Sequence, residues 1–77
     1  MAPTDDDEGP SGIHCRLDEL LAERAMTLTR LSELVGVSVV NLSVLKNDRA
    51  RAIRYSTLAA ICAALHCEVG DLLVVTP

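Results

Sequence analysis

Hydrophobic residues recur at helical spacing in two short segments at the middle of the chain, Leu28–Val35 and Val39–Lys46. A repeat of three or four residues is typical of an amphipathic helix with one buried side. The inward positions are Leu31, Leu34 and Val35 in the first segment and Leu42 and Leu45 in the second. The pattern therefore predicts two consecutive helices of eight residues each.

Three residues mark the ends of these predicted helices. Thr27 and Ser38 directly precede them, where a hydroxyl can accept a hydrogen bond from a backbone N–H of the first turn. Gly36 follows the first helix at a turn that requires positive φ. The combination predicts a helix-turn-helix, which places its second helix in the major groove of DNA. An αα-hairpin that never contacts nucleic acid would show the same pattern.

Further helices are predicted on both sides of this motif. One apolar stripe predicts a helix over residues 13–24, and a second predicts a helix that begins after Ser56 and ends at His66. Residues 68–73 suggest a fifth, short helical turn. The inward residues are Ile13, Leu17, Leu20 and Leu21 in the first stripe and Leu58, Ile61, Cys62 and Leu65 in the second.

Composition favours an all-α fold, a compact bundle of four to five short helices around the central motif. Tyr55 is the one aromatic residue among 77, so the core must be aliphatic. A chain of this length forms one small domain. No apolar stretch approaches the roughly 20 residues of a membrane span, and the start of the chain lacks the basic residues of a signal peptide. We expect a soluble cytoplasmic protein.

The net charge of −4 is unevenly distributed along the chain. Residues 5–8 are all acidic and contribute −4, whereas residues 13–77 carry seven basic and seven acidic side chains. Residues 27–54 carry five basic and two acidic side chains, a net charge of +3. Local charge, rather than the total, decides whether phosphates are attracted. We predict a disordered acidic leader over residues 1–12 and a helix-turn-helix domain over residues 13–77.

The segment from the second motif helix to the end carries a more specific resemblance. It reads NLSVLKNDRARAIRYSTLAAICAALHCEVGDLL. Together with the preceding helices from Leu17, it resembles the phage-repressor and Cro-type, or xenobiotic-response-element, helix-turn-helix family. It is similar to a subgroup of short bacterial regulators with the pattern N-L-S-x-L-K-N-G-K-A-x-A-I-R-[FY]-S-T-L. Departures are Asp48, where glycine is usual, and Val69, where proline is common.

The resemblance implies a lambda-repressor-like domain that binds double-stranded DNA as a homodimer and regulates transcription, as a repressor. It places the start of the second motif helix in the major groove, where the base-reading candidates are Val39, Val40, Asn41, Ser43 and Val44. Valine can contact the thymine C5-methyl group, and Asn41 can pair with adenine N6 and N7. Asn41 facing water or a phosphate is the alternative. The phosphate-contact candidates are Thr27, Thr29, Arg30, Lys46, Asn47, Arg49, Arg51 and Arg54.

Other chemistry is weakly indicated. Cys15, Cys62 and Cys67, with the histidines His14 and His66, could approach one another as a metal or thiol sensor. No dedicated ligand spacing is present, and Cys62 and Cys67 fall on core positions, so we predict no metal and no cofactor. No nucleophile–base pair or glycine-rich phosphate loop indicates an enzyme.

The C-terminal residues Leu72, Leu73, Val74 and Val75 are apolar, and the last three favour a β-strand with no obvious partner in the chain. Pairing with the same segment of a second subunit would make them a dimer interface. Folding back onto the monomer core is the alternative. The three valines of the second motif helix keep a further alternative open, a protein-interaction module of antitoxin or anti-repressor type.

Overall fold

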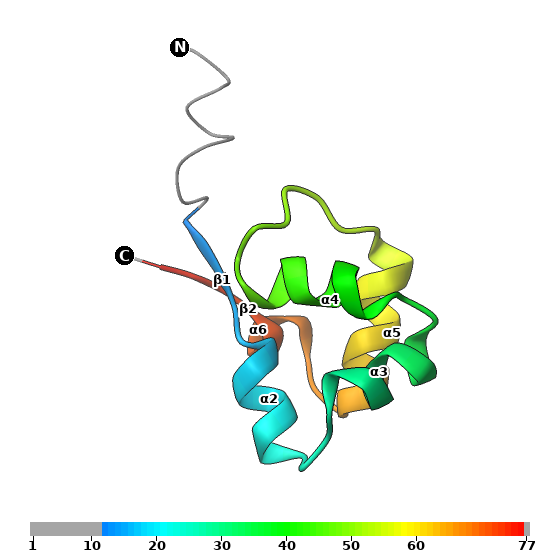
Figure 1. Cartoon of the computed structure of the whole chain (residues 1–77). Helices are drawn as coiled ribbons and strands as arrows, with labels where there is room; N and C mark the ends of the chain where they lie inside the picture. Colours follow the sequence, from blue (N-terminus) through cyan, green and yellow to red (C-terminus); the bar gives the residue numbers. More distant parts are fainter. Residues whose placement is uncertain (1–11, 77) are drawn as a thin grey trace.

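The computed structural model describes residues 12–76 and contains five helices and two short strands in that range (Figure 1). In chain order the elements are β1 (Ile13–Cys15), α2 (Leu17–Glu23), α3 (Leu28–Val35), α4 (Val39–Lys46), α5 (Tyr55–Leu65), α6 (Val69–Leu72) and β2 (Leu73–Val75). The mostly helical architecture is as predicted. The predicted acidic leader lies outside the described residues, apart from Gly12.

The two motif helices have the predicted bounds, and their predicted caps are present. The Thr27 hydroxyl accepts a hydrogen bond from the Arg30 backbone N–H at 3.0 Å. The Ser38 hydroxyl accepts one from the Asn41 N–H at 3.1 Å. Gly36 ends α3 in the left-handed conformation, at φ 73°. Local backbone chemistry therefore fixes where α3 stops and α4 starts.

Residues of α2, α3, α4, α5 and α6 form the core together with Cys15 of β1, and it is built from aliphatic side chains and two cysteines. Its fully buried members are Leu17, Leu31, Leu42, Ile61, Leu65 and Leu72. Leu34, predicted to face inward, is 48% exposed instead. The inward side of α3 consists of Leu31, which is buried, and of Leu28 and Val35, which are partly buried and pack against the core. Leu28 and Val35 lie about one helical turn before and after Leu31.

The N-terminal segment corrects two predictions. Residues 13–15 form a strand and not the start of a helix, so α2 begins only at Leu17. β1 pairs antiparallel with β2, with Ile13 opposite Val75 and Cys15 opposite Leu73. The C-terminal strand therefore has a partner within its own chain. This pairing satisfies backbone N–H and C=O groups near both chain ends, which a terminal helix turn at Ile13 would leave without partners.

The ends of α5 differ slightly from prediction. The helix begins at Tyr55 with Arg54 in the N-cap position, two residues before the predicted cap at Ser56. It ends as predicted at His66, which takes the left-handed conformation at φ 53°. The Arg24 guanidinium donates to the carbonyl oxygens of Leu65 at 2.7 Å and His66 at 3.3 Å. These bonds tie α2 to carbonyls that the helix end leaves unpaired.

Candidate nucleic-acid interface

α3 and α4 meet at a sharp corner. The bend between the two helices is 116°, within the range of about 90–120° that DNA-binding helix-turn-helix units show. The Ser32 hydroxyl donates to the Val37 carbonyl at 2.5 Å across the turn. This bond satisfies a carbonyl of the connecting segment and holds the corner in place.

The outer side of α4 is unusually apolar for an exposed helix face. Leu42 and Leu45 point into the core, whereas Val39, Val40 and Val44 are 39%, 71% and 38% exposed. An open hollow of about 310 Å³ runs along this side. Its lining residues are Val39, Val40, Ser43, Val44, Asn47 and Arg49. The structure thus gathers four of the five predicted base-reading residues with two predicted phosphate contacts; Asn41 is exposed on the same helix.

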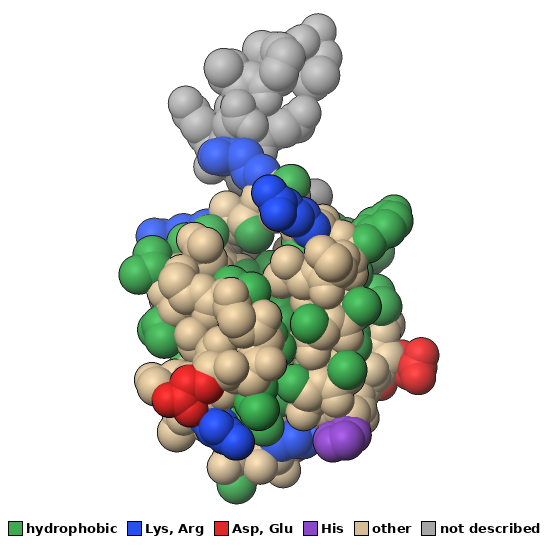
Figure 2. Space-filling view, turned by 90° about the vertical axis from the view of Figure 1, so that its right-hand side faces the viewer, with side chains coloured by type: hydrophobic (Ala, Val, Ile, Leu, Met, Phe, Trp, Pro, Cys, Tyr) green, Lys and Arg blue, Asp and Glu red, His purple; other side chains and the backbone are tan. Residues whose placement is uncertain are grey.

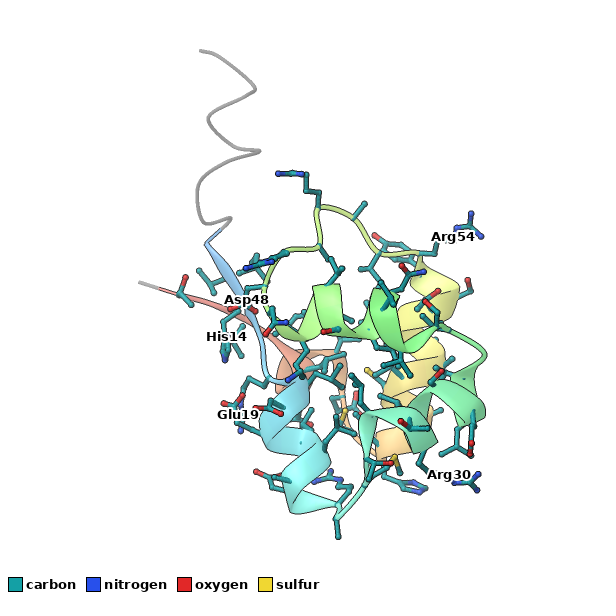
Figure 3. The ribbon with its side chains drawn as sticks, viewed as in Figure 1. His14, Glu19, Arg30, Asp48 and Arg54 are labelled. Carbon is teal, nitrogen blue, oxygen red and sulfur yellow. The ribbon has the colours of Figure 1, made fainter. Side chains whose placement is uncertain are left out.

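Basic side chains lie around this face. Residues 47–54 arch from the end of α4 to the start of α5 (Figure 1) and carry Arg49, Arg51 and Arg54. Arg49 and Arg54 form no ion pair with any acid among residues 12–76. Arg30 pairs with Glu33 at 3.1 Å, and Figure 3 shows Arg54 and Arg30 at opposite ends of one side of the molecule. Positive charge therefore flanks the α3–α4 unit.

Lys46 is placed differently from the arginines. Its ammonium nitrogen lies 3.8 Å from a carboxylate oxygen of Asp18, and its side chain is 28% exposed. The contact joins the last turn of α4 to α2. A lysine in this position also stabilises the negative end of the α4 dipole, so Lys46 has a structural role whether or not it contacts phosphate.

A polar junction that the sequence pattern did not predict lies at the end of α4. Asp48, at φ 61°, accepts the Cys15 backbone N–H at 2.7 Å and binds His14 Nδ1 at 2.8 Å. His14 Nε2 also lies 3.4 Å from Glu19 (Figure 3). The Cys15 N–H and then His14 lower the pKa of Asp48, and the Asp48 hydrogen bond raises the pKa of His14.

This junction explains the departure from glycine at Asp48. Aspartate tolerates the left-handed conformation better than most residues because its short polar side chain can bond locally. Here its two carboxylate oxygens bond to β1, which ties the strand to the start of the basic segment. An aspartate at an expected glycine position was the available signal, but its partners in β1 could not be foreseen while residues 13–15 were predicted as helix.

The cysteine and histidine residues lie in different places: His14 bonds to Asp48 at the end of α4, whereas Cys15 and Cys62 belong to the core. His14 contacts Asp48 and Glu19, and within residues 12–76 no three His, Cys, Asp or Glu side chains are placed to hold a metal ion. Burial, with Cys67 alongside, raises the pKa of the Cys62 thiol to about 11. Burial also raises the pKa of Cys15. Protonated thiols are poor nucleophiles and poor ligands, and both side chains serve the core.

The side of the molecule that faces the viewer in Figure 2 shows hydrophobic side chains scattered among polar and backbone atoms, with basic groups at both its upper and its lower end. No wide apolar face is seen there. Within residues 12–76 no single helix is long and apolar enough to cross a membrane; α3 and α4 pass that test only when taken together, across their 116° bend.

The capped helices, the left-handed glycine, the sharp corner and the exposed second helix define a helix-turn-helix protein. The chain belongs to the Cro/C1-type HTH DNA-binding domain family, whose model matches residues 16–77. This is a family of HTH DNA-binding transcriptional regulators, not of enzymes. The predicted resemblance to the Cro-type family is confirmed.

Two similar proteins agree with this membership. The chain is 58% identical over 61 residues to YozG, an uncharacterized HTH-type transcriptional regulator of Bacillus subtilis strain 168, covering 79% of this chain and 73% of the relative. The crystal structure of the transcriptional regulator VanUg, Form II, superposes with a TM-score of 0.68 at 32% identity. That match covers 86% of this chain and 89% of the VanUg chain.

Proposed function

We propose that this regulator is a sequence-specific repressor that binds double-stranded DNA as a homodimer in the bacterial cytoplasm, with α4 as its recognition helix. The observation that carries the proposal is the exposed side of α4, whose three valines share one hollow with Arg49. A helix of eight residues fits the major groove, which admits one helix. A repressor acts by occupying such a site.

The proposed roles of the side chains follow from their positions. Val39, Val40, Asn41, Ser43 and Val44 would face base edges. Asn41 is exposed and can donate to and accept from one adenine. Phosphate contacts would come from the α3 start and the segment after α4, through Thr27, Thr29, Arg30, Lys46, Asn47, Arg49, Arg51 and Arg54.

The proposed homodimer needs a different basis from the one predicted. Leu72 is fully buried in its own core and Leu73 is half-buried, so neither offers a free interface. Val75 is 79% exposed and lies opposite Ile13, 42% exposed, in the β1–β2 pair. A dimer is expected because a single helix-turn-helix reads only one half-site, which gives little specificity. We propose the exposed apolar end of the small sheet as the contact between the two subunits. Light scattering at micromolar concentration should give a mass near twice 8.2 kDa; the mass of one chain would refute the dimer.

The salt dependence of DNA binding tests the proposed interface. Arg49→Ala and Arg54→Ala should each weaken binding to every duplex, because each removes about one released counterion. The slope of log K against log salt should fall by roughly one per variant, and affinity by about fivefold at 0.15 M salt. Binding is measured by fluorescence anisotropy from 50 to 200 mM salt on a preferred and a random duplex.

Arg16→Ala is the matched control, since the Arg16 guanidinium contacts Glu19 and the Asp71 carbonyl and does not line the α4 hollow. It removes one positive charge but should leave the slope unchanged. Equal slopes for wild type, Arg49→Ala and Arg54→Ala would show that the basic segment does not face DNA. If no duplex binds at all, the exposed valines favour the second candidate function, a protein-interaction module.

A further inference from the structure

The apolar character of the exposed α4 face points to a particular DNA chemistry. Val39, Val40 and Val44 occupy one hollow rather than separate places on the surface, and none of them is needed for the core. Val40, the most exposed, keeps 71% of its surface accessible. A bound partner that covers these valines would remove their apolar surface from water, which favours binding.

The lining of the hollow combines an apolar half with a polar and basic half. Valine has neither a donor nor an acceptor, so three of the six lining residues cannot bond to a base edge. No acidic side chain lines it, because the Asp48 carboxylate is turned toward His14 and Cys15. Arg49 supplies a positive charge at the same place. The hollow along α4 therefore suits a partner that presents an apolar group to the valines and a negative charge to Arg49.

The major groove of DNA offers one apolar group of this kind, the C5-methyl of thymine. Cytosine at the same position lacks the methyl and so offers the valines no apolar contact in the groove. A valine face thus favours thymine over cytosine. A protein partner of the same apolar character would not require Arg49 in the hollow.

We propose that Val39, Val40 and Val44 read thymine C5-methyl groups, so that the preferred half-site is defined by methyl contacts more than by hydrogen bonds. This inference rests on the proposed function, in which α4 is the recognition helix. Asn41 and Ser43 supply the remaining polar contacts on the same helix. Each methyl buried against a valine strengthens binding by about fourfold, the effect of removing one apolar carbon group from water.

Replacing thymine by deoxyuridine isolates the methyl group, because the two bases have the same hydrogen-bonding edges. Preferred duplexes are first selected from a random pool with the full-length chain. Each thymine of the selected site is then replaced singly by deoxyuridine, and binding is measured by anisotropy. We expect a loss of about fourfold or more at one or more thymines of the site, and none for replacements in the flanking DNA.

The protein variants link that loss to the valines. Val40→Ser or Val44→Ser should bind the thymine and deoxyuridine duplexes alike at the position concerned, since the methyl no longer has an apolar partner. Both side chains are exposed, so the variants should keep the wild-type melting temperature. Val69→Ser, at a 47% exposed valine in α6, is the matched control and should keep the full discrimination.

Two results would overturn the inference while leaving DNA binding intact. One is equal affinity of the wild type for thymine and deoxyuridine at every position of a site that it distinguishes from random DNA. The other is a deoxyuridine loss that persists undiminished in Val40→Ser and in Val44→Ser. Failure of the pool selection to enrich any duplex, with no binding to random DNA, would instead refute the proposed function itself.

Discussion

Leu31→Ala should remove a large share of the unfolding free energy of this domain. Leu31 lies in the middle of α3 with none of its surface exposed, and truncation leaves a cavity in a packed core. The expected loss of unfolding free energy is about 2–5 kcal/mol. A domain of this length has roughly 4–12 kcal/mol in total, so the variant loses a large share of it.

Leu34→Ala is the matched control, with the same chemical change three residues further along the same helix. Leu34 is 48% exposed, so its truncation should change the unfolding free energy by no more than about 0.5 kcal/mol. Urea denaturation followed by circular dichroism measures both variants. Equal destabilisation of the two would show that the inward side of α3 is not the one described.

This pair also shows where hydrophobic patterning stops being informative. Leu31 and Leu34 are both leucines within one predicted stripe, and spacing alone gave them the same status. Which of them is buried depends on the angle at which α5 and α4 pack against α3, and that angle is set by tertiary contacts rather than by local sequence. The existence and bounds of α3 and α4 were predictable because caps and a glycine fix them locally.

The two chain ends show a different limit. Ile13 and Leu17 are four residues apart, which matches a helical stripe, yet Ile13 is in a strand. Its partner Val75 is more than 60 positions away in the sequence. Short strands leave almost no periodic signal over three residues, and long-range pairing cannot be derived from either segment alone. The same pairing hid the contacts of Asp48, whose two hydrogen bonds go to β1.

The candidate interface was more predictable than the sheet, because its residues lie in one continuous segment. The resemblance placed the groove-facing positions on α4, and the structure brings Val39, Val40, Ser43 and Val44 into one hollow. Lys46 could not be interpreted in the same way, because its Asp18 partner comes from α2. Side chains with partners on another element are the ones whose roles the sequence left open.

Gly36→Val should destabilise the domain by about 2–3 kcal/mol through the backbone alone. Gly36 has φ 73°, and a Cβ added there would meet no heavy atom within 4 Å. The cost therefore comes from placing a β-branched residue in the left-handed region and not from a clash. Since Gly36 ends α3 and opens the corner to α4, DNA affinity should fall together with stability.

Gly70→Val separates this backbone effect from the general cost of losing a glycine. A Cβ at Gly70 also meets nothing within 4 Å, but this glycine lies in α6 without positive φ. Its replacement should be close to neutral, because valine is no worse than glycine within a helix. The melting temperatures of wild type, Gly36→Val and Gly70→Val are measured by thermal unfolding under the same conditions. If all three proteins had the same melting temperature, the corner between α3 and α4 would not depend on a left-handed residue at Gly36.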